Sequence, residues 1–578
     1  MEQLDARDWH VLSVNVEGNQ AFSDYTLRAE ILTHSRPWYT LWQPRPIFDP
    51  GTLEQDLLRL RRFYEARGYF DARVVYDIEA SDVGTGDFLA ITFWIEEGEP
   101  STVGSVDVRV HGPENLGLPE SLSVKTGERF DEEAYQKADG DLKEFFLEKG
   151  YAHVEVNREA DVDAAAHRVK IEYDLTPGPE TYFGDVNVEG ADGVGSDIVL
   201  EDLEWKRGER FSIAKIKDSR EGLLKTHLFQ SVRIGWDTNG KPIEVPILVQ
   251  VGEKDHREVK LGVGYATDEK YRVQARWDNW NFFGGGRQMS VAVQYSSIEA
   301  SLAAMFMQPH FLSQHTNGIV EAKTARDDED NYVLYAEQLQ PRLEHKFSTA
   351  LSGSLGYRLE ADDLSKVDES TVEALGGVKR RLTLFGPTLG LVWNTSDSPF
   401  DPHAGEVVSL QSIVAGPGDF RFWKADVEGK KYTSLPWNVV LANRLRIAFA
   451  DAFGSEENLP IFERLYAGGA RSVRGYGRRR LGPRDSSNNP IGGLSAIEGS
   501  AELRHAIWDG IGGAVFLDFG QVTTRRFDIP VDDLKFATGF GLSYMTPVGP
   551  LRVDVGFPFE RPPGDAGWQL YFSIGQFF

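Results

Sequence analysis

Apolar and polar residues alternate strictly along many short segments in the second half of the chain. In "PLRVDVGF", Leu551, Val553 and Val555 share one face of an extended strand, and Arg552 and Asp554 fall on the other. The segments "REVKLGVGYAT", "RQMSVAVQY" and "FATGFGLSYMT" alternate in the same way, with turn signals between the segments. This segregation is typical of a transmembrane β-barrel, whose strands contact lipid on one face and a wet lumen on the other.

The length and the ends of these segments favour a barrel over a soluble β-sandwich, whose strands also alternate. The segments run to about ten residues, the length that a tilted strand needs to cross a bilayer. Their apolar faces end in aromatic residues, as the interfacial girdles of barrels do: Tyr265, Trp277, Tyr295, Tyr544 and Trp568. Residues 257–578, at roughly twenty residues per strand and loop, predict an antiparallel barrel of about 16 strands.

The chain ends inside this pattern. The last segment, "GWQLYFSIGQFF", places on one face the residues Trp568, Leu570, Phe572, Ile574 and Phe578. Unpaired backbone groups in hydrocarbon cost several kcal/mol each, so a terminal strand must pair with the first strand. We therefore expect a seam between the strand near residues 257–266 and the strand 567–578.

The first half of the chain contains a repeat. "PIFDPGTLEQDLLRLRRFYEARGYFDARVVYDI" aligns with "ERFDEEAYQKADGDLKEFFLEKGYAHVEVNREAD", and a third copy repeats the tetrad Gly-Glu-Arg-Phe of residues 127–130 at 208–211. Each copy reads strand, helix, helix, strand, strand, and Gly68 and Gly150 fall where a helix ends. The repeat predicts three similar α+β modules at residues 1–99, 100–178 and 179–256, before a barrel at 257–578.

Composition excludes several classes of function. The chain has no cysteine, which removes disulfides, thiolate zinc sites and cysteine nucleophiles and fits the periplasm. A net charge of -27 opposes nucleic-acid binding, which needs a basic face. No stretch of 18 apolar residues occurs, so we expect no membrane-spanning helix. The start, "MEQLDARDWH", lacks a cleavable signal peptide, so we expect a cytosolic chain or a processed or trimmed exported one.

The most basic segment of this acidic chain is "GGARSVRGYGRRRLGPR", in a long loop between two late strands. Strand parity turns Glu502 and Asp518, on neighbouring strands, toward the lumen. A buried carboxylate needs a partner, and an arginine on a loop that folds back into the barrel satisfies both acids with forked hydrogen bonds. We assign no partner to Arg478–Arg480; a solvated loop and a lipopolysaccharide contact both remain open.

These motifs together resemble the superfamily of POTRA-plus-barrel outer-membrane assembly proteins that includes BamA and TamA. The repeats are similar to POTRA modules, "SVRGYG" is similar to the sixth extracellular loop of the family, and "GGLSAIEGSAELR" and "AVFLDFG" are similar to its adjoining strands. The resemblance implies that Val473, Arg474, Gly475 and Tyr476 form the lumen loop motif, with Glu502 and Asp518 as its wall partners. The final Phe578 resembles the terminal targeting signal of outer-membrane proteins.

The resemblance implies a β-barrel insertase or chaperone in the bacterial outer membrane, with its N-terminal half in the periplasm. Its implied partners are outer-membrane lipid, client outer-membrane and autotransporter-type polypeptides, and a TamB-like periplasmic protein. Three modules favour TamA, because BamA typically has five and two-partner secretion transporters have two. If further modules were lost upstream of Met1, the BamA interpretation would again be favoured.

Three alternatives remain open from the sequence. The alternatives are a BamA-type general assembly subunit, a pore that secretes one soluble partner, and an enzyme. The sequence contains no HExxH, no GxSxG and no cysteine, and its histidines are scattered, so we expect no catalytic residues, no cofactor and no metal. A structural spacer is the alternative for any single module.

Overall fold

The computed structural model describes residues 9–36, 44–81, 87–112, 116–266, 270–416, 418–454, 459–508, 510–546, 549–561 and 564–574. It divides into two compact units. The first unit contains Met1–Val188, Leu203–Glu221 and Arg233–Gln250, and the second contains Glu189–Asp202, Gly222–Val232 and Val251–Phe578.

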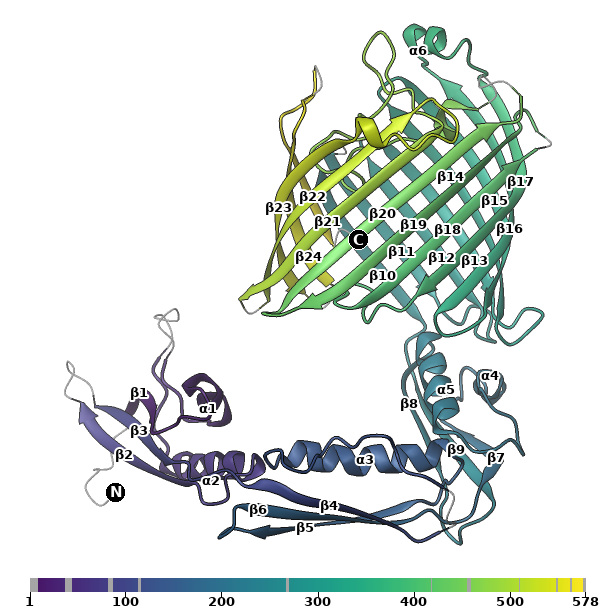
Figure 1. Ribbon diagram of the computed structural model, residues 1–578. Helices are drawn as coiled ribbons and strands as arrows, with labels where there is room; N and C mark the ends of the chain where they lie inside the picture. The colour runs from purple at the N-terminus through teal and green to yellow at the C-terminus, as the bar shows by residue number, and fades with distance from the viewer. Residues whose placement is uncertain are drawn as a thin grey trace. The chain divides into compact units, whose positions relative to one another are not determined.

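The N-terminal half forms three three-stranded sheets, one per repeat (Figure 1). The first module has β1 (His10–Glu17), α1 (Asp24–Glu30), α2 (Pro50–Ala66), β2 (Arg73–Ser81) and β3 (Phe88–Glu96); the second has β4 (Thr102–Val110), α3 (Glu132–Glu148), β5 (Glu155–Asp163) and β6 (Arg168–Thr176); the third has β7 (Tyr182–Glu189), α4 (Ser196–Glu201), α5 (Ile213–Lys225), β8 (Phe229–Trp236) and β9 (Glu244–Glu253). The strand orders are β1-β3-β2, β4-β6-β5 and β7-β9-β8, so the last strand of each repeat is central.

The long helices begin and end at chemically similar residues. Asp49 and Asp131 cap α2 and α3 by accepting hydrogen bonds from backbone N–H groups of the first turn. Gly68 and Gly150, directly after these helices, have φ values of 86° and 81°, the left-handed conformation that glycine adopts without strain. In the third copy, His227 follows the helix and adopts the same left-handed backbone conformation, with a φ of 61°.

The second module departs from the predicted order. The repeat predicts two helices between its first and second strands, but described residues 116–131 contain turns there and no helix. Phe130 and Val124 of this segment are nevertheless buried in the core of the module with Leu142 and Phe146. Turns therefore cover the sheet region that α1 and α4 cover in the other two modules.

Sixteen antiparallel strands form a closed barrel, as the sequence predicts. They are β10 (Arg257–Ala266), β11 (Lys270–Asn279), β12 (Gln288–Ser296), β13 (Glu299–Gln308), β14 (Thr316–Glu329), β15 (Tyr332–Lys346), β16 (Leu351–Ser365), β17 (Arg381–Asn394), β18 (Gly405–Ala415), β19 (Phe422–Leu435), β20 (Val439–Ala452), β21 (Ser495–Trp508), β22 (Ile511–Thr523), β23 (Lys535–Thr546), β24 (Gly549–Pro558) and β25 (Gln569–Ile574). One further helix, α6 (Glu369–Ala374), lies between β16 and β17.

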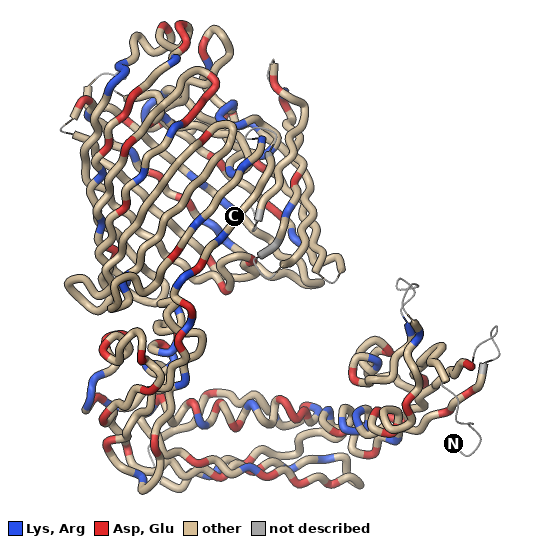
Figure 2. Tube along the Cα trace, turned by 180° about the vertical axis from the view of Figure 1, so that it is seen from behind, with Lys and Arg blue, Asp and Glu red and all other residues tan. Residues whose placement is uncertain are grey.

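The two faces of the wall differ as the alternation predicts. Leu261 and Val263 on β10 are 80% and 72% exposed on the outer face. Glu502, Asp518 and Arg552 occupy the inward-facing positions of their own strands, and their side chains are buried inside the barrel. Figure 2 shows both basic and acidic residues along the barrel strands. None of the helices in the described part of the chain is long and apolar enough to cross a membrane.

Within the second unit, the end of α4 lies against a turn of the barrel. The ring of His310, between β13 and β14, is 2.9 Å from Glu201 through Nδ1 and 2.9 Å from Asp202 through Nε2. The hydrogen bond with Asp202 raises the pKa of His310, burial lowers it, and Glu201 raises it further, with a net increase. In its protonated form, the ring bridges the module helix and the barrel turn with two hydrogen bonds.

This contact is expected to weaken as the pH rises. Because the pKa of His310 is higher in the folded state, the contact stabilises the fold fully at a pH below the unfolded-state pKa of about 6.5. This stabilisation is lost as the pH rises through the folded-state pKa. Hydrogen–deuterium exchange, corrected for intrinsic rates, should show protection of residues 196–202 falling as the pH rises above about 6.5 in the wild type but not in His310→Asn. The control His403→Asn, in another turn, should keep the wild-type profile; a fall of equal size in His310→Asn would contradict the assignment.

Candidate functional site: the lumen loop and the strand seam

The long loop between β20 and β21 passes through the barrel lumen. Val473, Arg474 and Tyr476 of its motif are at most 1% exposed, although they lie in a loop without regular structure. Val473 lies against the wall at Gly520 of β22, where a Cβ would come within 2.8 Å of the valine side chain. The motif is therefore packed as a core segment.

Arg474 contacts both of the predicted wall partners. Its Nε and Nη2 donate to the two carboxylate oxygens of Asp518 at 2.8 and 2.9 Å, and its Nη1 donates to Glu502 at 2.8 Å. The backbone N–H of Arg474 also donates to Asp518, at 3.0 Å. The guanidinium carbon lies 3.4 Å from the ring centroid of Phe516, a close cation–π contact. Charge-assisted forked bonds of this kind fix both the position and the orientation of the loop.

Two further arginines complete the cluster, and sequence reasoning did not connect them to the motif. Arg552 of β24 donates to both oxygens of Glu502 at 2.7 Å and to Asp554 at 2.9 Å, and Arg504 donates to Glu502 at 2.7 Å. Three arginines therefore face three carboxylates, so the buried cluster is formally neutral. Strand parity was the available signal: Arg552 and Asp554 share the polar face of their strand, and Arg504, two residues after Glu502, shares the parity of that residue.

Two glycines bring the motif against the backbone of the wall. Gly475 has a φ of 102°, and a Cβ there would lie 3.0 Å from backbone atoms of Phe557 and Pro558. On the wall side, a Cβ at Gly556 would lie 2.6 Å from the backbone nitrogen of Gly475. Residues without side chains are required on both sides of this contact.

Tyr571 connects the motif to the terminal strand. Its hydroxyl donates to the carbonyl of Tyr476 at 3.2 Å and accepts from the backbone N–H of Gly475 at 3.4 Å. Tyr571 is 3% exposed and belongs to β25, the strand that closes the barrel. The sequence pattern drew attention to the outward face of this strand and so missed Tyr571, whose inward parity was the only signal for its role.

Arg478, Arg479 and Arg480, to which the sequence assigned no partner, are half-buried and bonded to residues of the barrel. Arg478 donates to Glu329 at 2.5 and 2.7 Å, and Arg479 donates to the hydroxyl of Tyr332 at 2.7 Å. Arg480 and Arg484 both contact Asp565, which is 6% exposed, at 2.5 and 2.7 Å. The basic segment is held by acids at one rim of the barrel, which explains its place in an acidic chain.

The seam is the weakest-paired junction in the described barrel. β10 pairs with β11 over ten residue pairs, but the register of β10 with β25 contains only Ala266 with Tyr571. If the ladder continued, Val263–Tyr265 would pair with Phe572–Ile574. The structure describes all of these residues, and none of them is paired between β10 and β25. The predicted seam residues Trp568 and Phe572 are exposed outward, Leu570 is half-buried, and β25 ends at Ile574; Phe578 lies outside the described residues.

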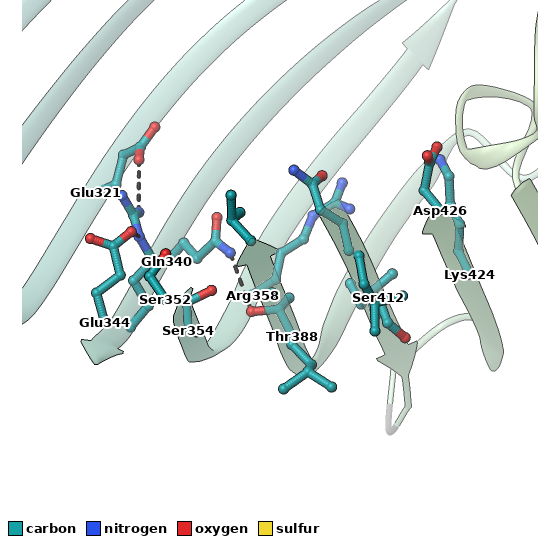
Figure 3. A pocket seen from close by; sticks show the side chains of 18 of the residues that line it. Glu321, Gln340, Glu344, Ser352, Ser354, Arg358, Thr388, Ser412, Lys424 and Asp426 are labelled. Atoms are coloured by element: carbon teal, nitrogen blue, oxygen red, sulfur yellow. Dashed lines mark hydrogen bonds and ion pairs between the residues drawn. The ribbon is translucent and has the colours of Figure 1, made fainter. Parts of the chain in front are cut away.

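A polar cavity of about 600 Å³ lies along the lumen wall formed by strands β14 to β20 (Figure 3). Arg342 donates to Glu321 at 2.9 Å, and Gln340 donates to Thr388 at 3.3 Å. Arg358, which also lines the cavity, contacts Glu463 of the long loop at 2.7 Å. The lumen therefore has a polar, charged cavity on this side, and the loop motif packs against the wall on the other.

Two known domain families match the chain. The Omp85 superfamily domain matches residues 281–578, more than half of the chain. The chain belongs to the Omp85 superfamily. The POTRA repeat, described as a surface antigen variable number repeat, matches residues 10–98 and 112–178.

Similar Omp85 proteins include two outer membrane protein assembly factors BamA. The protein of Nitratidesulfovibrio vulgaris is 26% identical over 98% of this chain and 73% of its own length, and that of Neisseria meningitidis serogroup B is 22% identical over 98% and 78%. The crystal structure of Haemophilus ducreyi BamA lacking POTRA domains 1–3 has the same fold, with a TM-score of 0.62 and 18% identity over 81% of this chain and 99% of that one. This Omp85 chain lies in the bacterial outer membrane, with its N-terminal POTRA modules in the periplasm.

Proposed function

We propose that this Omp85 chain inserts β-barrel polypeptides into the outer membrane by adding client strands at its own seam. One observation carries the proposal: β10 and β25 share a single residue pair in the described structure, beside a loop motif that is anchored by buried ion pairs. An exposed strand edge is a template on which another strand can pair. The edge faces lipid, where a client strand must finally lie.

The proposed reaction needs neither an enzyme nor a cofactor. Each client strand that pairs in the bilayer satisfies backbone N–H and C=O groups that otherwise cost several kcal/mol each. Client folding therefore supplies the driving force. The role of the chain is to hold an open edge in position, which Arg474 and Tyr571 do by fixing the loop against the wall and the terminal strand.

We infer client outer-membrane polypeptides as partners, bound first by the periplasmic modules. The similar proteins named above are BamA assembly factors, and their similarity over 98% of this chain supports a general assembly role. A TamA-type role, with autotransporter clients and a TamB-like partner, stays a prediction from the number of modules. The packed loop motif in the lumen supports insertion over secretion through an open pore.

A reversible lock of the seam tests the proposal. The chain has no cysteine, so Tyr265→Cys and Phe572→Cys place a single pair of thiols on the outward-exposed positions directly after the last residue pair of the ladder. In phospholipid vesicles that contain the full chain, the oxidised variant should lose most of its ability to fold a urea-denatured eight-stranded barrel client. Reduction should restore it.

A second pair provides the matched control. Val293 and Leu302 are already paired between β12 and β13 and face outward, so Val293→Cys with Leu302→Cys adds a cross-link without closing an edge. This variant should fold the client at the wild-type rate in both redox states. Equal client folding by the oxidised seam variant would overturn the proposal.

A further inference from the structure

Among the described residues, the seam is paired at one end only. β10 begins at Arg257, where the chain enters the barrel from the periplasmic modules, and it ends at Ala266. The Ala266 end therefore belongs to the outer rim of the barrel, away from the periplasm. The single pair of the seam, Ala266 with Tyr571, lies at this outer end, and Val263–Tyr265 lie on its periplasmic side. One residue pair contributes little stability, so other contacts decide whether the outer end stays closed.

The turn before β25 is held by the basic segment of the lumen loop. Asp565 lies just before Gln569, the first residue of β25, and its side chain is buried. Its carboxylate oxygens accept hydrogen bonds from Nε of Arg480 at 2.5 Å and from Nη2 of Arg484 at 2.7 Å. Its backbone carbonyl accepts a further bond from Arg561, at 2.6 Å. Two guanidinium groups on one buried carboxylate fix the point at which the chain enters β25.

The same segment is bonded on the other side of the seam. Arg478 donates to both carboxylate oxygens of Glu329, the last residue of β14, at 2.5 and 2.7 Å. Arg480, which binds Asp565, also contacts Asp330 in the turn that follows β14, at 3.4 Å. In the order of the wall, the seam and the strands β10 to β13 lie between β25 and β14. The basic segment therefore connects the two sides of the seam at the outer rim.

We call residues Arg478–Arg484 the strap. The strap is fixed to the earlier part of the loop by backbone hydrogen bonds. The N–H of Arg479 donates to the carbonyl of Gly468 at 3.3 Å, and the N–H of Leu481 donates to the carbonyl of Ala467 at 3.0 Å. Backbone bonds and ion pairs together make the strap a span of defined length between its two attachment points, rather than a flexible tether.

We propose that the strap keeps the outer end of the seam closed while client strands add to the edge of β10 on the periplasmic side. The inference rests on the proposed strand addition at the seam and adds how that seam is regulated. Arg480 and Arg484 are positioning residues, because they act on β25 through Asp565. With the outer end held, the edge can accept a strand while the barrel stays sealed to ions at its outer rim. A charge-assisted hydrogen bond changes an equilibrium constant by about tenfold or more, which sets the size of the expected effect.

Ion conductance of the full chain in planar phospholipid bilayers tests the proposal. In Arg480→Gln with Arg484→Gln, the frequency of conducting openings should rise about tenfold. The matched control, Arg381→Gln with Arg525→Gln, removes the same charge from arginines that are 88% and 68% exposed and should behave as the wild type. Asp565→Asn should raise the frequency by a similar factor, and its combination with the two strap substitutions should add nothing, because all three remove the same contacts. Heat-modifiable migration on gels should show a folded barrel in every variant.

A locked seam shows where the ions pass. When Tyr265→Cys and Phe572→Cys are added to the strap variant and oxidised, the additional openings should disappear. If they persist, the ions pass through the lumen and the strap holds the loop rather than the seam, which would overturn the proposal. Openings no more frequent in the strap variant than in the control, or no increase in Asp565→Asn, would overturn it as well.

Client folding in vesicles separates this inference from the proposed function. The strap variant should still fold the denatured client, because the edge of β10 is unchanged; loss of client folding would mean that strand addition itself needs the strap and would contradict the proposal. If the chain with an oxidised seam and an intact strap folds the client at the wild-type rate, the proposed function fails and the role of the strap in client addition fails with it. If that lock blocks client folding but the strap variant conducts as the wild type does, only the strap is overturned.

Discussion

Replacement of Arg474 with alanine is expected to lower the free energy of unfolding of the barrel by about 3–5 kcal/mol and to slow client assembly. The substitution leaves Asp518 buried with Ser500 as its remaining side-chain donor, at 2.6 Å. Glu502 keeps Arg504 and Arg552, so most of the cost falls on Asp518. The barrel itself should still insert, because the wall strands keep their backbone ladders.

Urea unfolding in detergent, followed by tryptophan fluorescence, measures the stability, and folding of a denatured client in vesicles measures assembly. Arg474→Lys should recover only part of both, because an ammonium group cannot make the forked bonds to Asp518. Arg381→Ala removes an 88% exposed arginine paired with Asp363 and should change neither. Wild-type stability together with full client assembly in Arg474→Ala would contradict the anchoring role.

Coupling between the partners distinguishes an ion pair from simple packing. In Arg474→Ala with Asp518→Asn, the uncompensated charge is removed, so the double variant should be more stable than the sum of the two single effects predicts. Simple loss of side-chain contacts would give additive effects.

Strand parity made much of this cluster predictable. Side chains alternate with a period of two, so the outward Leu503 and Leu517 fix Glu502 and Asp518 as inward residues. The resemblance of the loop motif then paired them with Arg474. Arg552 belongs to β24, three strands away from β21, which carries Glu502, and no pattern within one strand shows that the inclined wall brings the two side chains together.

Contacts made by the loop were less accessible from sequence. Arg478 meets Glu329, which is 149 positions away, and Arg480 meets Asp565, which is 85 positions away. A loop has no period from which the direction of a side chain follows, and its path depends on the shape of the lumen. The turns that replace the first helix of the second module were hidden for a related reason, since a repeat in the long helix does not fix what precedes it.

Part of the seam followed from strand parity, and part of it could not be read from the sequence. The outward parity of Trp568, Leu570 and Phe572 was readable, but the extent of pairing with β10 was not. Tyr571 shows why the extent matters: among the described residues of β25, it is the one that pairs with β10, and its hydroxyl also bonds to the loop motif. The state of the seam and the position of the loop are therefore linked through one side chain.

Replacement of Gly475 with alanine tests this link and is expected to destabilise the barrel by about 2–4 kcal/mol. A non-glycine residue at a φ of 102° is strained, and the added Cβ would lie 3.0 Å from the backbone of Phe557 and Pro558. The motif must then move away from β24. That movement breaks the hydrogen bond from the Gly475 N–H to Tyr571, so β25 loses a contact with the loop.

Two measurements on this variant should therefore change together. The urea midpoint should fall, and the yield of the disulfide between Tyr265→Cys and Phe572→Cys should fall as well, because a released β25 spends less time in register with β10. Gly429→Ala on β19 is the matched control, since a Cβ there meets nothing within 4 Å. A lower midpoint with an unchanged disulfide yield would show that the loop stabilises the wall without controlling the seam, and the link through Tyr571 would then be wrong.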